Sequence, residues 1–335
     1  MISLVNYIKE GIFDDEITVS RKSDKAILKA QRDSVRDFVM QNYTGIGRIK
    51  VSEKRNSDGL YEVSTKGNAE LKWHSDRITN GDFTWTEVGK SFKLYFCEAE
   101  NLEGCPKKVG HDFIMNGCDI KSLKGCPEYV GGRMFITRCN DLTSLEYAPK
   151  QIGEEGLKSS LLRVDYCNNI KSIEGCPSIV GMLHLHELPK LNSLKGCPEN
   201  VFEISLWDLY VLKDLKYFPK KANTIHINSC PIKSLKGICS AKQIRINHTD
   251  IENLEGMPDV ENGYFNLDLY SNEKLKTLKG GPSDVFNLNL SACDKLTAQG
   301  MEDKHIYVSG RLNPPPGITY SNLPKGWTYA SLGYW

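Results

Sequence analysis

The sequence predicts an α+β fold: a solenoid with one parallel β-sheet of about ten strands, preceded by a small α+β cap. Three observations predict it. A five-residue phrase, Leu-Lys/Glu-Gly-Cys-Pro, returns at a nearly constant interval along the chain. Pairs of apolar residues at period 2, typical of short half-buried strands, return at the same interval. The segment 1–84 contains neither pattern. Each unit of such a chain buries its apolar face against its neighbours.

The recurring phrase predicts a tight corner in each unit. Glycine adopts backbone angles that other residues avoid, and proline cannot continue a ladder of backbone hydrogen bonds. Some copies are close to the consensus and others are weaker. The close copies are Leu102–Pro106, Leu123–Pro127, Ile173–Pro177 and Leu194–Pro198, and the weaker ones are Leu145–Pro149, Leu215–Pro219, Leu235–Cys239, Leu254–Pro258 and Leu278–Pro282.

Ten segments between these corners follow one template: apolar, x, apolar, x, x, and then Cys or a substitute. The second apolar residue falls at positions 94, 115, 136, 164, 185, 206, 227, 246, 269 and 290, in steps of 21, 21, 28, 21, 21, 21, 19, 23 and 21. The Cys position is expected to turn inward, where a small side chain with a weak S–H donor bridges backbone groups. The long step predicts an insertion near Glu154–Ser160.

Over roughly residues 85–312, this pattern resembles the leucine-rich repeat. With its Leu-x-Ser-Leu-x-Gly-Cys/Ala-Pro-x-x-Val-Gly-Gly phrase, the chain is similar to the leucine-rich-repeat-like arrays of tailed bacteriophages and gut bacteria. The resemblance implies a phage-encoded protein. It also implies that the protein recognises a host or phage protein, including a host defence factor, through a concave sheet face.

Both ends of the chain are expected to close the solenoid. Residues 1–84 form the predicted α+β cap, 85–312 the solenoid and 313–335 a C-terminal aromatic cap. The N-terminal cap is predicted to contain helices at Ser3–Ile12 and Ser23–Asn42, the second capped by Ser23, and a hairpin of Arg48–Ser52 with Leu60–Ser64. The residues expected to close the C-terminal end are Ile306–Val308 as a last strand and the side chains of Trp327, Tyr329, Tyr334 and Trp335.

The first residues leave an alternative open. The segment Ile8–Gly11 matches the Ile/Leu-x-Glu-Gly sequences that prohead proteases of T-even-like phages cut, and the preceding residues resemble N-terminal helices of virion-associated proteins. The alternative prediction is therefore a virion-associated structural or packaged protein with an N-terminal targeting helix. The competing interpretation of the same residues is a capping helix.

Charge and composition argue against several classes of function. The 43 basic and 42 acidic residues give a net charge of +1, so neither generic nucleic-acid binding nor binding to an acidic membrane is expected. The acidic N-terminus lacks the apolar stretch of a secretory signal. Eleven cysteines in such a chain are expected to be reduced thiols, which favours a cytoplasmic location in the bacterial host, with the virion as the alternative.

Partner-binding residues are expected on the strands, at positions that alternate with the buried ones. His, Trp, Arg and Tyr gather at these positions in the middle of the array, and such side chains often dominate the binding energy of protein interfaces. Any exposed polar sheet face would look similar, so the alternative is an ordinary solvated surface. The candidates are Tyr95, Arg163, Asp165, His184, His186, Trp207, His226, Arg245, Asn247 and Tyr270.

Metal binding and catalysis find little support in the sequence. His184 and His186 lie on one strand face, but His226, the nearest further ligand, is expected about 10 Å away. No Cys-x-x-Cys pair occurs, and equivalent cysteines would stack about 4.8 Å apart, which favours core packing over a zinc site. No catalytic Ser-His-Asp or Cys-His set is suggested by spacing. We therefore expect a non-enzymatic protein without a cofactor or metal.

Overall fold

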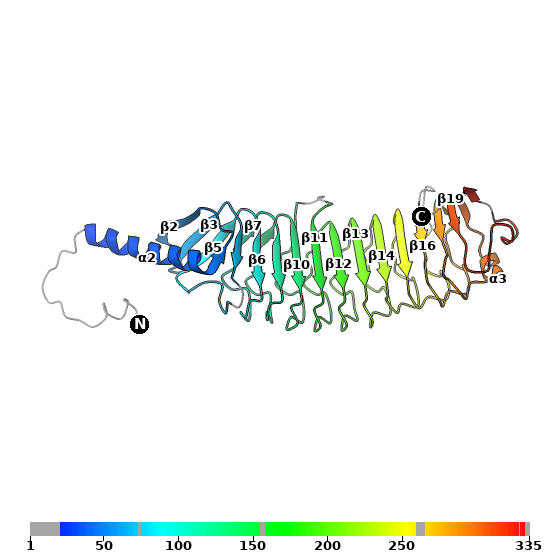
Figure 1. Ribbon diagram of the computed structural model, residues 1–335, viewed down its shortest axis with the longest axis horizontal. Helices are drawn as coiled ribbons and strands as arrows, with labels where there is room; N and C mark the ends of the chain where they lie inside the picture. Colours follow the sequence, from blue (N-terminus) through cyan, green and yellow to red (C-terminus); the bar gives the residue numbers. More distant parts are fainter. Residues whose placement is uncertain (1–20, 73–74, 155–157, 259–264, 328, 332–335) are drawn as a thin grey trace.

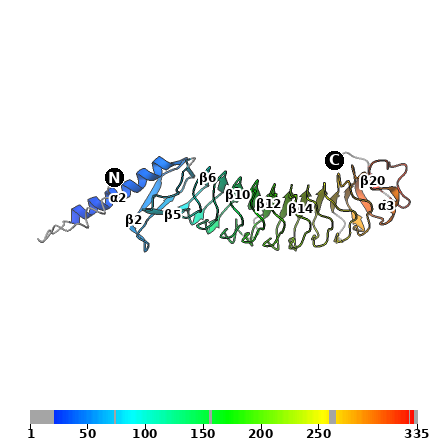
Figure 2. The ribbon, with the colours of Figure 1, turned by 90° about the horizontal axis from the view of Figure 1, so that it is seen from below.

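The computed structural model describes residues 21–72, 75–154, 158–258, 265–327 and 329–331. These residues form one elongated body in which the strands succeed one another along the long axis (Figure 1). Seen from below, successive turns of the chain stack along the same axis (Figure 2). The fold is a mostly-β parallel solenoid, as the sequence predicts. We call each turn of the solenoid a coil.

Within the described residues, the larger of two sheets contains fifteen strands. Ten of them come from the predicted repeats, and five more extend the sheet at its ends, because strands without the repeat pattern also pair with it. The repeat strands are β6 (Phe92–Tyr95), β8 (Phe113–Asn116), β10 (Arg133–Thr137), β11 (Leu161–Asp165), β12 (Met182–His186), β13 (Glu203–Trp207), β14 (Thr224–Asn228), β15 (Gln243–Asn247), β16 (Asn266–Asp268) and β18 (Asn287–Asn289). The added strands are β1 (Tyr43–Thr44), β4 (Ala69–Leu71), β17 (Asp284–Val285), β19 (Tyr307–Asn313) and β20 (Tyr329–Ser331).

Repeat strands pair in parallel and in register, so equivalent residues of successive coils lie side by side. Ile136 of β10 is opposite Val164 of β11, and Val164 is opposite Leu185 of β12. The register therefore holds across the longest step of the repeat. Part of that predicted insertion, residues 155–157, lies outside the described residues.

The second sheet has five strands and begins with the predicted hairpin. Strands β2 and β3 pair antiparallel, as expected, and the remaining neighbours pair in parallel. Both sheets extend across position 84, where the sequence predicts the end of the cap. The strands are β2 (Ile49–Arg55), β3 (Tyr61–Thr65), β5 (Phe83–Val88), β7 (Lys108–Val109) and β9 (Tyr129–Val130).

Helix α2 (Arg21–Asn42) confirms the second predicted helix and covers the N-terminal end of the solenoid (Figure 1). Because the helix already includes Arg21, Ser23 is not its N-cap. Val35 and Val39 are buried, whereas Ile27 and Leu28, which share the helical spacing of apolar residues, are exposed. The predicted helix Ser3–Ile12 and the Ile8–Gly11 segment lie outside the described residues.

After each repeat strand, one residue with positive φ turns the chain toward the interior. Its φ lies between 48° and 67° in all ten coils, although only one of these residues is glycine. This left-handed conformation costs an ordinary residue about 1–2 kcal/mol, so the surrounding stack must enforce it. The ten residues are Phe96, Gly117, Arg138, Tyr166, Glu187, Asp208, Ser229, His248, Ser271 and Ala292.

The residue that follows points into the core, and in six of the ten coils its side chain hydrogen-bonds to a carbonyl of the preceding coil, as predicted for the Cys position. Cys118 donates its S–H to the carbonyl of Leu94 in the preceding coil at 3.4 Å, and Cys293 donates to the carbonyl of Leu269 at 3.1 Å. Asn272 replaces Cys in one coil and makes hydrogen bonds through both ends of its amide. The ten positions are Cys97, Cys118, Cys139, Cys167, Leu188, Leu209, Cys230, Thr249, Asn272 and Cys293.

The C-terminal end is closed by β19, the short helix α3 (Ala298–Glu302) and Trp327. β19 begins within the predicted strand and ends at Asn313, just before the prolines. Trp327 is buried, as predicted, and Tyr329 begins β20, which pairs with β19. Tyr334 and Trp335 lie outside the described residues.

Candidate functional site

Eight of the ten predicted binding residues lie together in two rows on the outer face of β11–β15. The sheet register places Arg163, His184, His226 and Arg245 in the first row, with Ser205 between the two histidines. The second row contains Asp165, His186, Trp207, Asn228 and Asn247. We call this surface the outer face.

The remaining two candidates lie away from this group. Tyr95 belongs to β6, which is separated from β11 by β8 and β10. Tyr270 follows β16 and contacts the ring of His248 edge to face, with ring centroids 5.7 Å apart. The structure therefore brings Tyr95 into no contact with the cluster, and Tyr270 extends the outer face toward the C-terminal end.

Three stacked rings form the centre of the outer face. The rings of His184 and His186 are 5.6 Å apart and 14° from parallel. The His186 ring in turn stacks on Trp207 at 5.5 Å and 26°. The His186 imidazole therefore stacks on two other rings, while Trp207 remains 43% exposed.

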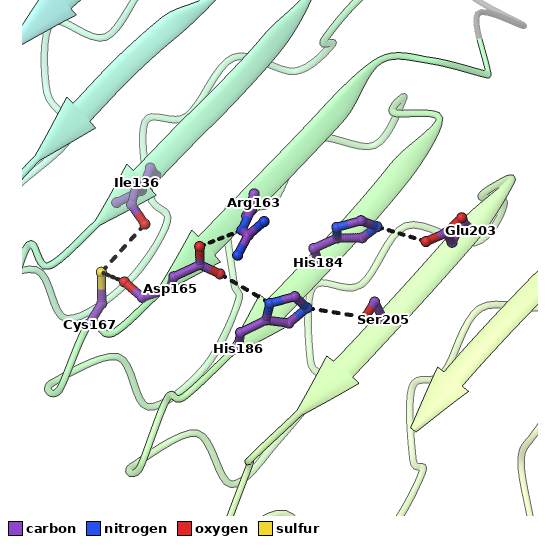
Figure 3. Close-up of polar contacts among 8 residues, drawn as sticks. All are labelled: Ile136, Arg163, Asp165, Cys167, His184, His186, Glu203 and Ser205. Carbon is purple, nitrogen blue, oxygen red and sulfur yellow. Dashed lines mark hydrogen bonds and ion pairs between the residues drawn. The ribbon is translucent and has the colours of Figure 1, made fainter. Parts of the chain in front are cut away.

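His184 and His186 each make polar contacts with side chains of neighbouring strands (Figure 3). Arg163 donates from Nε to one carboxylate oxygen of Asp165. The other carboxylate oxygen of Asp165 is 3.5 Å from His186 Nδ1. His186 Nε2 lies 3.1 Å from the Ser205 hydroxyl, and His184 Nε2 lies 2.9 Å from a carboxylate oxygen of Glu203. Each histidine ring is thus oriented by a polar partner on a neighbouring strand.

Burial changes the protonation of these groups. Burial, together with the charges of Arg163 and His184, lowers the pKa of His186 from 6.5 to about 4. Burial also lowers the pKa of His226, and it raises the pKa of Asp165 against the opposing effect of Arg163. His186 is therefore neutral at pH 7, with a free lone pair on one ring nitrogen.

The depressed pKa of His186 predicts a loss of stability in mild acid. Between pH 6.5 and pH 4 the unfolded chain binds a proton at this residue and the folded chain does not, so acid favours unfolding. We expect the His186 contribution to fall by about 2 kcal/mol between pH 7 and pH 5. Urea unfolding of the wild type and of His186→Gln at both pH values measures this change in the free energy of unfolding. The variant should lose less stability than the wild type, whereas His111→Gln, which changes an exposed histidine, should behave like the wild type. Equal losses in all three proteins would contradict the predicted shift.

The outer face is hollowed along this cluster. A shallow depression of about 560 Å³ extends over β11–β14, and its floor includes Ser205 and His226. A second depression of about 240 Å³ continues it as far as Asp268, because both share Trp207 and His226. Tyr166, Glu187 and Asp208, which have positive φ, line one edge. Together they form a trough from β11 to β16 with Trp207 near its middle.

Alternation along the strand places Ser205 on the outer face, but it does not predict the contact of Ser205 with His186. It also gives no indication of Glu203 or of Tyr166, Glu187 and Asp208 at the edge of the trough. The signal that could have found them is the position that each occupies within its repeat. Asp165 and His186 are one repeat apart and occupy one row, whereas Ser205 lies in the other row on the next strand. The contact between Ser205 and His186 is diagonal, so it follows only from the register of three strands and the rotamers of large rings.

The cysteines pack in the core or against it. All eleven are free thiols. Burial raises the pKa of Cys97 to about 11 and that of Cys230 to about 12, so these thiols stay protonated at pH 7. In the described ranges, no three His, Cys, Asp or Glu side chains are arranged to hold a metal ion.

Similarity to known proteins indicates no function for this chain, so the proposed function depends on the geometry of the outer face. Neither a family model, nor a curated protein, nor a solved structure matches the chain. Within the described part of the chain, no helix has both the length and the apolar character needed to cross a membrane.

Proposed function

We propose that this protein is a recognition solenoid that binds another protein through the trough on its outer face. The observation that supports this most is Trp207, which is 43% exposed yet fixed against the stacked histidines. A rigid, exposed tryptophan loses little conformational freedom on binding and offers a large area for burial, as do the residues that dominate many interfaces. Exposed Tyr166 lines the same depression as Trp207, and exposed Tyr270 extends the outer face toward the C-terminal end.

The corner side of the coils is a weaker candidate for recognition. Its exposed lysines and glutamates pair with one another between successive coils, and such solvated pairs contribute little to binding. The pairs are Glu100–Lys121, Glu103–Lys124, Glu174–Lys195, Glu199–Lys220, Glu252–Lys276 and Glu255–Lys279. The outer face, by contrast, combines aromatic rings with buried polar atoms that lack hydrogen-bond partners, such as Asp165 Oδ1 and His226 Nε2.

The class of partner is proposed from the repeats. The recurring Leu-x-Ser-Leu-x-Gly-Cys-Pro phrase supports a leucine-rich-repeat-like protein encoded by a bacteriophage. Such a protein would act in the cytoplasm of the infected bacterium on a host or phage protein, for which a host defence factor is the first candidate. The net charge of +1 supports a protein partner over nucleic acid.

Truncating the two side chains at the centre of the outer face should abolish capture of the partner. We expect Trp207→Ala combined with His226→Ala to weaken binding about 100-fold or more, since single interface tryptophans often contribute at least about 2 kcal/mol. Affinity capture from host lysate, followed by titration of the captured protein, measures the effect. Tyr217→Ala, which removes a 48%-exposed aromatic side chain at a corner, is the matched control. Undiminished affinity in the double variant, with an unchanged circular dichroism spectrum, would exclude the outer face.

A further inference from the structure

Asp165, His186 and Ser205 stand in series on three adjacent strands. The register puts Asp165 of β11 directly opposite His186 of β12, and Ser205 lies on β13, the next strand. The His186 ring presents Nδ1 to the carboxylate at 3.5 Å and Nε2 to the serine hydroxyl at 3.1 Å (Figure 3). A carboxylate, an imidazole and a hydroxyl in this order are the groups that activate a serine for attack on acyl carbons.

Neighbouring side chains orient the carboxylate and the imidazole for this role. His184 on the same strand and Trp207 on the next strand both stack on the His186 ring, which limits its rotation. Arg163 binds one oxygen of the Asp165 carboxylate, and the other oxygen, Oδ1, is buried without a hydrogen-bond partner. That oxygen is available to accept a hydrogen bond from Nδ1–H. A proton on Nδ1 leaves the Nε2 lone pair free to accept the Ser205 proton.

A donor for the developing negative charge lies on the other side of Ser205. His226 is directly opposite Ser205 in the register, and both line the 560 Å³ depression. Nε2 of His226 is buried and has no hydrogen-bond partner. As the protonated nitrogen of a neutral ring, it would donate to an oxyanion formed at the serine. Trp207, at the rim, offers an apolar wall for an acyl group.

We propose that Ser205 is a nucleophile for carboxylic esters, with His186 as its general base, Asp165 as the residue that positions His186, and His226 as the oxyanion donor. The Ser205 oxygen attacks the ester carbonyl and its proton passes to His186 Nε2. The carbon–oxygen bond to the alcohol then breaks, and the alcohol leaves with that proton. Water, deprotonated by His186, attacks the acyl-serine, and the carboxylic acid leaves as Ser205 regains its proton.

The electrostatics restrict the substrates. The charged and titratable groups around His186 are Asp165 and Arg163 on β11, His184 on its own strand, and Glu203 on β13. Tyr166, Glu187, Asp208 and His226 line the same depression. Burial, followed by the effects of Arg163 and His184, lowers the pKa of His186 to about 4, so the imidazole is a weak base that is neutral across physiological pH. A weak base suits esters and phosphonates whose leaving groups depart readily.

A fluorophosphonate probe tests the proposal. The probe's phosphorus takes the place of the acyl carbon and fluoride is the leaving group. We expect one label per chain, located on Ser205 by peptide mass spectrometry and absent from Ser205→Ala. His186→Gln should slow labelling at least about 100-fold. Ser291→Ala, which removes another hydroxyl on the strand face, should label like the wild type.

The pH profile separates catalytic from structural effects. The labelling rate should fall with a midpoint near pH 4, where His186 becomes protonated. Asp165→Asn should slow labelling and move that midpoint lower, because the carboxylate no longer favours the protonated imidazole. A folded wild-type protein that is not labelled at Ser205, or labelling unaffected by His186→Gln, would overturn the proposal. Capture of a partner that depends on Trp207 would then still support the proposed recognition function.

Discussion

Gly125→Ala is expected to lower the free energy of unfolding by about 4 kcal/mol. Gly125 has φ +86°, and a Cβ added there would lie 2.5 Å from the carbonyl carbon and oxygen of Leu102 and from the amide nitrogen of Glu103. The left-handed conformation costs alanine about 1–2 kcal/mol, and forcing apart two packed coils costs about 1–3 kcal/mol more. Urea unfolding followed by circular dichroism measures the loss.

Gly59→Ala is the control for this change. Gly59 has φ +76°, close to that of Gly125, but nothing lies within 4 Å of an added Cβ. Gly59→Ala should therefore lower the free energy of unfolding only by the cost of the left-handed conformation, about 1–2 kcal/mol. If the two variants lost equal stability, close stacking of the corners would not be a source of the fold's rigidity.

Asn272→Leu is expected to lower the free energy of unfolding by about 3 kcal/mol without introducing a clash. Asn272 is fully buried, and its amide oxygen accepts from the backbone N–H and the hydroxyl of Thr249 at 3.0 and 2.6 Å. Its amide nitrogen donates to two backbone carbonyls, including that of Leu269 at 2.8 Å. Leucine would leave all four partner groups buried without these hydrogen bonds.

The neighbouring coils supply the matched comparison. Leu188 and Leu209 occupy the position equivalent to Asn272 and are fully buried there, so leucine itself fits this part of a coil. Asn272→Cys should lose less than Asn272→Leu, because a thiol at this position reaches a carbonyl in other coils. Thermal and urea unfolding of both variants would measure the difference. A leucine variant as stable as the wild type would show that the amide bonds contribute no net stability.

Much of the fold follows from the sequence because a repeat applies one local rule many times. Alternating apolar residues specify which strand face is buried, and the corner glycines specify where the backbone turns. The turn residues after the strands carry no such signal. Arg138 and Tyr166 adopt a conformation that side chains disfavour, and only the stacking of coils enforces it. The sequence also undercounts the sheet, since β1 and β4 join it without the repeat pattern.

The candidate site, like the fold, is predicted by the sequence only in part. Alternation along a strand identifies Arg163, Trp207 and Arg245 as outward residues, and the common register brings them together. Tyr95 satisfies the same pattern but lies several strands away. The contact of Ser205 with His186 depends on side-chain rotamers and a diagonal across the sheet, which no pattern in one strand can specify.

Photo-crosslinking tests the central claim, recognition through the outer face, most directly. Tyr270 and Tyr217 have similar exposure, 43% and 48%, but Tyr270 extends the outer face and Tyr217 lies at a corner. Each would be replaced by p-benzoylphenylalanine in otherwise wild-type protein, irradiated in host extract and analysed by mass spectrometry. We predict a specific crosslink to one protein from position 270, lost when Trp207→Ala is added, and none from position 217. Crosslinks from position 217 alone would contradict recognition through the outer face.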